Sequence, residues 1–269
     1  MESLTARRTR WMTLAEWQPR ANVGGPMPRR TPYHRPLDVA ETTLKEVLAQ
    51  AHRPGLEEPQ YDMLRTSSRS GGGKDDVRVF LAGDRSLLTR KCVSVVGTRD
   101  VSPEGWQRAS QLARKLASYG IVVVSGLAKG VDTAALSAAI KAGGDTIAVI
   151  GTALSKAYPA ENWQLQEEIW QHHLLMSPFG EGEPVFKSNF PKRNRVMAAI
   201  SDATVIIEAS DTSGTLHQAA ECQRLGRWLF IAKSVADNLS LKWPKSFLGQ
   251  PKTAVLEKTE DILEAINAE

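Results

Sequence analysis

Short, uninterrupted apolar runs alternate with segments of helical periodicity over most of the chain after residue 76. The runs are rich in β-branched residues, and such runs are typical of strands that are buried on both faces of a parallel sheet. They predict strands at residues 93–96, 121–124, 146–150, 174–176, 203–207 and 228–231.

The segments between the predicted strands carry apolar residues at helical spacing. The clearest of them places Trp106, Ala109, Leu112, Ala113 and Leu116 on one helical face. Strands that alternate with helices in this way predict an α/β fold with a doubly wound, mainly parallel sheet, which is an extended Rossmann-like architecture. The remaining helices are expected near residues 131–141, 162–171, 194–201 and 215–225.

The first 76 residues have little aliphatic periodicity and many arginines and prolines. Such a segment buries little apolar surface, so we expect a largely irregular, basic N-terminal extension. One helix is predicted within it, over residues 38–51, with Val39, Leu44, Val47 and Leu48 on one face.

A run of serine and glycine at residues 67–73 has the composition of a flexible linker. We therefore divide the chain into an Arg/Pro-rich extension with its linker, residues 1–76, and a Rossmann-like domain, residues 77–269.

The overall composition is that of an ordinary globular protein, with 42% hydrophobic residues, 24% charged residues and a net charge of +4. This mild basic excess alone favours a solvated surface over a nucleic-acid site. Cys92, Cys222 and the five histidines show no metal-ligand spacing, so we expect buried reduced thiols, no metal and no cofactor. Without a membrane-length apolar stretch or a secretory signal, a cytoplasmic location is expected.

Ligands of doubly wound sheets bind at the carboxyl ends of the strands, so the loops that follow the strands are the candidate sites. Glycine lets the backbone approach a ligand, arginine can form two hydrogen bonds to a phosphate, and helix N-termini attract anions. Together the loops predict a phosphate-lined crevice, although Asp132 can either cap its helix or contact the ligand. The residues concerned are Gly97, Thr98 and Arg99 after the first strand, Ser125, Gly126 and Lys129 after the second, and Ser213, Gly214 and Thr215 after the fifth.

The segment 187–195 lies between two predicted strands, just before a predicted helix, and contains no acidic residue. Basic groups neutralise phosphates and an aromatic ring offers a stacking surface to a base, a combination that suits single strands. We therefore predict that this segment is the main contact with single-stranded DNA, although Arg193 or Arg195 could instead pair with Glu181 or Glu183 and hold the loop. The predicted contacts are Lys187, Phe190, Lys192, Arg193, Asn194 and Arg195.

Five short sequence motifs in the loops described above and in the segment 158–162 resemble motifs of the DprA/Smf family of DNA-processing proteins, in their order and approximate spacing. The resemblance covers roughly residues 77–235, and the string Phe-Pro-x-Arg-Asn-Arg is its most specific part. It implies a non-enzymatic protein that binds single-stranded DNA in a basic pocket, forms a homodimer and loads a RecA-like recombinase. It also implies that Arg99, Lys129, Lys192, Arg193 and Arg195 face phosphates, above a pocket floor shaped by Gly97, Ser125, Gly126, Gly214 and Thr215. The strings that carry it are 97–99, 125–132, 158–162, 190–195 and 213–216.

Departures from the family pattern, such as Ala135 and Leu136 where a histidine is usual, suggest a specialised relative acting in recombination, DNA uptake or phage defence. One alternative is a nucleotide-sensing or antitoxin protein that neutralises a phosphoribosyltransferase-like toxin. A less favoured one is a nucleoside-monophosphate phosphoribohydrolase, because His217 and Gln218 stand where that chemistry needs carboxylates. Glu208 and Glu221 lie nearby in the sequence and could supply the carboxylate, so the hydrolase stays an alternative.

Overall fold

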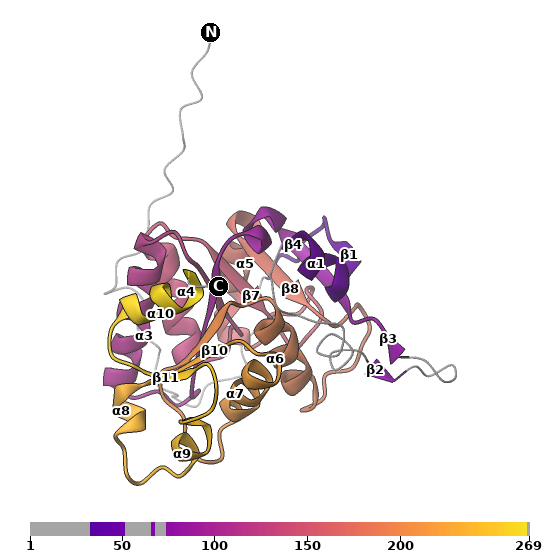
Figure 1. The fold of residues 1–269 in the computed structure, drawn as a ribbon. Coiled ribbons are helices and arrows are strands. Elements are labelled where there is room, and N and C mark those ends of the chain that lie inside the picture. The colour runs from indigo at the N-terminus through magenta and orange to yellow at the C-terminus, as the bar shows by residue number, and fades with distance from the viewer. Residues whose placement is uncertain (1–32, 52–65, 68–73, 268–269) are drawn as a thin grey trace, which may run out of the picture. The chain divides into compact units, whose positions relative to one another are not determined.

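A nine-stranded sheet organises the residues that the computed structural model describes, which are 33–51, 66–67 and 74–267 (Figure 1). These residues belong to one compact unit that runs from Pro32 to Glu269. The strands, in their order across the sheet, are β1 (Ala40–Thr43), β4 (Arg78–Gly83), β8 (Leu174–Ser177), β7 (Thr146–Val149), β6 (Val122–Ser125), β5 (Cys92–Val96), β9 (Ala203–Ile206), β10 (Trp228–Ala232) and β11 (Thr253–Leu256).

The sheet is parallel from β8 to β11, while β4 and β1 extend it antiparallel at one edge. The chain runs from β5 through β6 and β7 to β8 on one side, then returns to β9 on the other side of β5. The doubly wound, mainly parallel sheet predicted from the sequence is therefore confirmed. Its topological switch point lies between β5 and β9, where such sheets bind ligands.

Helices cover both faces of the sheet (Figure 1). In β5, Val93 and Val95 pack in a cluster with α3, α4 and α10, whereas Cys92 and Val96 face the side that carries α6 and α7. None of the described helices is long and apolar enough to cross a membrane. The helices are α1 (Leu44–Gln50), α3 (Pro103–Ser118), α4 (Val131–Lys141), α5 (Trp163–His172), α6 (Asn189–Ala199), α7 (Thr215–Arg224), α8 (Lys233–Ala236), α9 (Trp243–Phe247) and α10 (Thr259–Asn267), with short 3-10 turns η1 (Arg85–Thr89) and η2 (Ala160–Asn162).

The two cysteines are buried free thiols. Burial raises the pKa of Cys222 to about 12, so this thiol stays protonated at neutral pH.

The described part of the N-terminal extension adds a strand and a helix to the sheet edge. The prediction of one helix over residues 38–51 is wrong at its start, because β1 pairs with β4 and the helix begins at Leu44. Thr43 and Glu46 form a capping box that fixes this start. The predicted apolar face holds for Leu44, Val47 and Leu48, which are buried.

Residues 1–32 and most of the linker lie outside the described residues. The short antiparallel pair of β2 (Thr66–Ser67) and β3 (Lys74–Asp75) forms a sheet of its own, and the boundary at residue 76 stays a prediction.

The basic segment is itself helical, since α6 begins at Asn189 and not near residue 194 as predicted. Pro191 is compatible with this position because the first turn of a helix needs no backbone donor there. Helical geometry divides the segment into two faces. Arg193 is only 6% exposed, whereas Lys192 and Arg195 point to solvent.

Arg193 anchors α6 to the sheet. Its Nη1 donates a hydrogen bond of 2.7 Å to the carbonyl of Val149, at the end of β7. The buried carboxylate of Asp132 lies within electrostatic range and accepts hydrogen bonds from the backbone of Gly126 (3.1 Å) and Ala128 (3.4 Å). Burial raises the pKa of Asp132 and lowers the pKa of Arg193, and the attraction between the two charges opposes both shifts. Arg193 and Asp132 thus hold α6, β7 and the loop after β6 in place.

Gly126 is required by this arrangement. A Cβ atom at this position would overlap the guanidinium of Arg193, with Nη1 as its nearest neighbour. The glycine therefore serves close packing.

Leu44→Ala is expected to lower the free energy of unfolding by about 2–5 kcal/mol, because the side chain is fully buried in the core. Leu37→Ala is the matched control. Leu37 is 91% exposed, so its loss should change the free energy of unfolding by less than about 0.5 kcal/mol. Urea unfolding followed by circular dichroism measures both, and equal midpoints would contradict the packing of α1 on the sheet.

Gly126→Ala is expected to lower the free energy of unfolding by about 1–3 kcal/mol, because the added methyl group displaces the buried Arg193. Gly214→Ala is the control, since a Cβ there meets no atom within 4 Å and the backbone φ is −61°. Its stability should stay within about 0.5 kcal/mol of the wild type. The midpoint of thermal unfolding measures the stability of both variants. An unchanged midpoint for Gly126→Ala would show that the side chain of Arg193 is free to move.

Candidate nucleic-acid interface

A cleft of about 650 Å³ opens at the switch point between β5 and β9. Its walls are the loop after β5, the loop after β9 and the helix α6. A cleft of this size suits one or two nucleotides. Of the residues predicted from the sequence it brings together Gly97, Thr98, Arg99, Lys187, Phe190, Arg193, Asn194, Ser213, Gly214 and Thr215.

Five other predicted residues do not line this cleft. Ser125 and Gly126 lie beneath it, and the hydroxyl of Ser125 donates to the carbonyl of Val95 at 2.7 Å. Lys129 forms an ion pair with Glu161, and Lys192 is exposed on the outer face of α6.

Arg195 also lies outside the cleft, where it binds Glu221 at 3.1 Å. Of the two acids that the sequence offered as partners for Arg193 or Arg195, Glu181 accepts a hydrogen bond from Ser155 and Glu183 accepts one from the backbone of Gly180. Arg195 thus links α6 to Glu221 on α7.

The loop after β6 differs from the anion site that its glycines suggested. The backbone N–H groups of Gly126 and Ala128 already donate to the carboxylate of Asp132. Leu127, between them, has a left-handed φ of 58° and a fully buried side chain. The loop is therefore a fixed wall in which a side chain of the protein takes the place predicted for a phosphate.

Phe190 forms the aromatic centre of the cleft. The guanidinium of Arg99 lies over its ring, 5.2 Å from the centroid, and Tyr158 packs beside it at 5.5 Å between ring centroids. A Cβ atom on Gly151 would lie 3.0 Å from the ring, so this glycine gives Phe190 its room. Tyr158 was not among the predicted contacts, although it belongs to one of the strings that carry the family resemblance.

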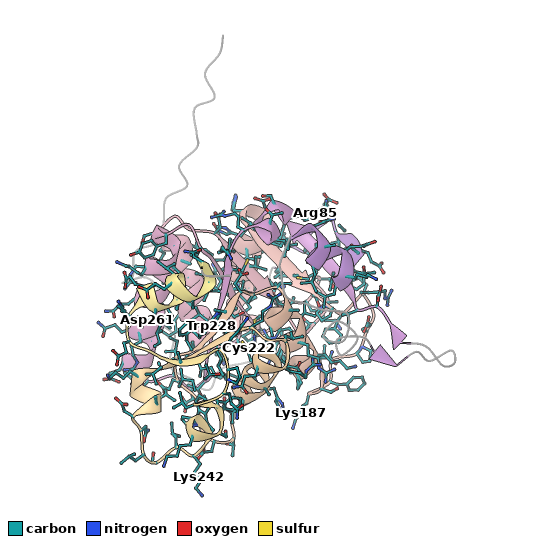
Figure 2. All side chains as sticks on the ribbon, in the orientation of Figure 1. Arg85, Lys187, Cys222, Trp228, Lys242 and Asp261 are labelled. Atoms are coloured by element: carbon teal, nitrogen blue, oxygen red, sulfur yellow. The ribbon has the colours of Figure 1, made fainter. Side chains whose placement is uncertain are left out.

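The cationic groups of the cleft repel one another. The charge of Arg99 is among the causes that lower the pKa of the buried Arg193, after burial itself. Lys187 extends outward from the molecule (Figure 2). Asp100 and Asp132 are the carboxylates among the described residues that line the cleft. An anion placed between Arg99 and Arg193 would relieve their repulsion.

Glu208 and Glu221, the two carboxylates that a hydrolase could use, do not line the cleft. Glu208 accepts hydrogen bonds from the hydroxyl of Ser102 (2.7 Å) and its backbone N–H (3.2 Å), at the start of α3. Glu221 is bound by Arg195 and Arg224. Two residues after Thr215 that were not predicted as contacts, His217 and Gln218, do line the cleft. Among the described residues, no cluster of three or more His, Cys, Asp or Glu is placed to hold a metal ion.

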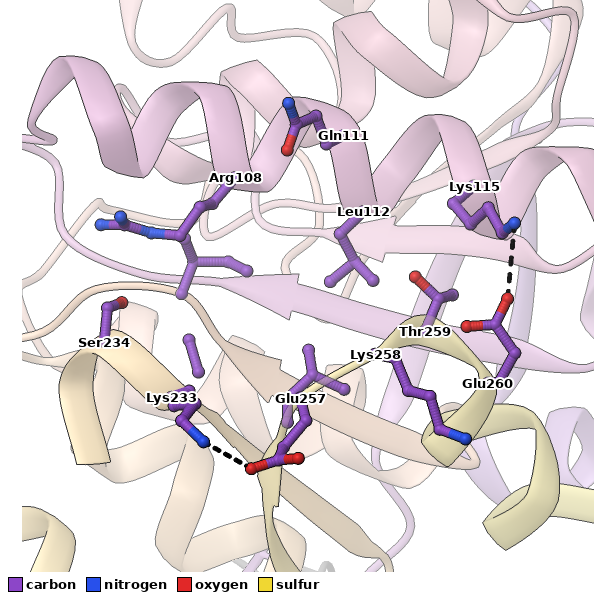
Figure 3. Close-up of a pocket in the computed structure, with 13 residues that line it drawn as sticks. Arg108, Gln111, Leu112, Lys115, Lys233, Ser234, Glu257, Lys258, Thr259 and Glu260 are labelled. Atoms are coloured by element: carbon purple, nitrogen blue, oxygen red, sulfur yellow. Dashed lines mark hydrogen bonds and ion pairs between the residues drawn. The ribbon is translucent and has the colours of Figure 1, made fainter. Parts of the chain in front are cut away.

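A second cleft, of about 500 Å³, lies between α3 and the segment that leads into α10 (Figure 3). Its three lysines already have acidic partners, because Lys115 lies 3.4 Å from Glu260, Lys233 lies 2.6 Å from Glu257 and Lys258 lies 3.9 Å from Asp261. The cleft around Phe190 is therefore the better candidate for an anionic ligand.

Comparison with known proteins relates the chain to DNA-processing proteins. It is 42% identical to the DNA processing protein DprA of Streptococcus pneumoniae over 165 residues, which are 61% of this chain and 58% of that protein. It is 32% identical to the DprA of Bacillus subtilis, over 70% of this chain and 63% of that one. The chain thus spans about three fifths of the length of these two relatives.

Solved structures give the same relation. The crystal structure of the S. pneumoniae protein matches with a TM-score of 0.63 and 37% identity, over 70% of this chain and 65% of that one. DNA processing protein A of Helicobacter pylori, whose structure was described for its single-stranded DNA binding mode, matches with a TM-score of 0.65 and 26% identity, over 81% and 98% of the two chains. The model of the family described as DNA recombination-mediator protein A matches residues 73–267, and the chain belongs to that family.

Proposed function

We propose that this chain is a DNA-processing protein of the DprA type that binds single-stranded DNA in the cleft around Phe190. The observation that carries the proposal is the combination of an aromatic ring with two mutually repelling guanidinium groups, Arg99 and Arg193, in one cleft. A single strand has both a phosphate for the cations and an unpaired base for the ring. A relative described for its single-stranded DNA binding mode supports the same function.

The predicted site residues take three roles in this proposal. Arg99, Lys187 and Phe190 contact the strand directly, with Thr98 and Asn194 beside them. Ser125 and Gly126 support the floor of the cleft from beneath, and Arg193 forms part of that floor and adds its charge. The cations outside the cleft, Lys129, Lys192 and Arg195, contribute long-range attraction to DNA, which ionic strength screens. The small residues Ser213, Gly214 and Thr215 leave room for the backbone of the strand, while Gly97 lets the loop after β5 pack closely on Val131 and Glu208.

The proposed role is non-enzymatic and cytoplasmic. A RecA-like recombinase and a second copy of the chain remain proposed partners, as the family resemblance implies. Binding that strengthens over several nucleotides supports DNA as the ligand, whereas saturation by a mononucleotide would favour a nucleotide sensor. Free base released from nucleoside monophosphates would instead show a hydrolase.

The salt dependence of oligonucleotide binding tests the cationic contacts. Each phosphate contact to a single strand contributes about −0.7 to the slope of log affinity against log salt, so Arg99→Ala and Lys187→Ala should each flatten this slope by about 0.7. Arg114→Ala is the control, because Arg114 is an exposed cation of α3 that does not line the cleft, and its loss should leave the slope nearly unchanged. An equal flattening in all three variants would remove the cleft as the phosphate site.

Phe190→Ala tests the stacking contact. Loss of one base–aromatic stack should weaken oligonucleotide binding by about 1–3 kcal/mol and leave the salt slope unchanged. Tyr119→Ala, at an exposed aromatic outside the cleft, should bind like the wild type. Fluorescence anisotropy with a labelled oligonucleotide measures both variants, and wild-type affinity in a folded Phe190→Ala protein would contradict the proposed site.

A further inference from the structure

Two carboxamide side chains on neighbouring helices meet the same cleft. Gln218 of α7 is fully buried and Asn194 of α6 is 8% exposed, and both line the cleft that holds Phe190. Met197 of α6, also buried, lines it with them. The oxygen of an amide accepts hydrogen bonds, so it cannot bond to the oxygens of a phosphate.

One end of the Gln218 carboxamide is anchored and the other is not. Its Nε2 donates to the hydroxyl of Thr204, on β9, at 3.2 Å. Its Oε1 is buried and has no hydrogen-bond partner among the described residues. Rotating the amide by a half turn would exchange the two ends and leave the nitrogen without a partner instead, so one hydrogen-bonding group stays unsatisfied in either orientation.

Asn194 adds a second carboxamide to the lining of the cleft. Its side chain is 8% exposed and makes no hydrogen bond within the described residues, but its amide is not among the fully buried groups that lack a partner. Buried polar groups in folded proteins are nearly always hydrogen-bonded, and each exception calls for an explanation. The unpaired oxygen of Gln218, with the amide of Asn194 in the same lining, indicates that a ligand completes the hydrogen bonds of this cleft.

The chemistry of a carboxamide identifies the part of the ligand that it binds. An amide offers a donor and an acceptor side by side, which matches the edge of a nucleobase and not the acceptor-only oxygens of a phosphate. A base that stacks on Phe190 occupies the same cleft as both amides. Its unpaired edge is free to bond with them, because the bases of a single strand lack partners.

We propose that Gln218 and Asn194 form a base-reading subsite, which gives this protein a preference among the bases of single-stranded DNA. Gln218 hydrogen-bonds the edge of the base that stacks on Phe190, with its far end held by Thr204. This inference rests on the proposed DNA-binding function and adds sequence preference to it.

Homopolymers of deoxyadenosine, deoxycytidine and deoxythymidine of equal length test the subsite in the full chain. The wild type should bind the best and the worst of them with affinities that differ by about tenfold or more, the effect of one good base contact. Gln218→Met, which keeps the volume and removes both polar ends, should reduce this ratio to about twofold. Its salt slope should stay that of the wild type, because no phosphate contact is lost.

The thermal stability of the free protein separates this role from a structural one. Gln218→Met gives up the hydrogen bond to Thr204 but also removes a buried oxygen that has no partner, so the two effects oppose each other and the unfolding midpoint should change little. Gln223→Met is the matched control on the same helix, since Gln223 bonds to Thr253 (3.0 Å) away from the cleft and its loss should leave base preference intact. Asn194→Leu provides a second variant that should also lower the ratio.

The inference is overturned if Gln218→Met keeps the full preference, which would mean that the amide of Gln218 does not read the base. It is also overturned if the wild type binds all three homopolymers equally well, a result that leaves the proposed DNA binding intact. Absence of binding to every oligonucleotide would instead overturn the proposed function itself.

Discussion

The hydrogen bond from the buried Arg193 guanidinium to the end of β7 is the constraint on which the cleft depends. It fixes the rotation of α6 about its own axis, and that rotation decides which side chains of the basic segment enter the cleft. Phe190, Asn194 and Met197 share the face of Arg193 at helical spacing, so one buried contact positions all of them. The carboxylate of Asp132 provides the opposite charge that a buried guanidinium needs.

This anchor also connects parts of the chain that are distant in sequence. Asp132 binds the loop after β6, Arg193 binds the end of β7, and the ring of Phe190 rests against Gly151 and Arg99. On the far side of α6, Glu221 joins Arg195 to Arg224 and so ties α6 to α7. The walls of the cleft are therefore preorganised by groups outside its lining, and a bound strand does not have to order them.

The fold could be predicted from the sequence because strands buried on both faces leave a continuous apolar signature, which each of the six predicted strands carries. The loops of the site followed from topology, since the carboxyl ends of parallel strands meet at one edge. The directions of the side chains were harder to predict from the sequence than the fold. Treating residues 187–193 as a loop hid the helical spacing that separates Phe190 and Arg193 from Lys192 and Arg195. Gln218 carried no signal, because a glutamine in a helix is ordinary until its burial is known.

The position of Arg99 over Phe190 has a consequence for the protein when no DNA is present. A guanidinium over the ring covers an aromatic face that would otherwise stand open at the mouth of a cleft. The residue that we propose to receive the strand thus also covers the ring in the unliganded protein, and a base that stacks on the same face has to displace it.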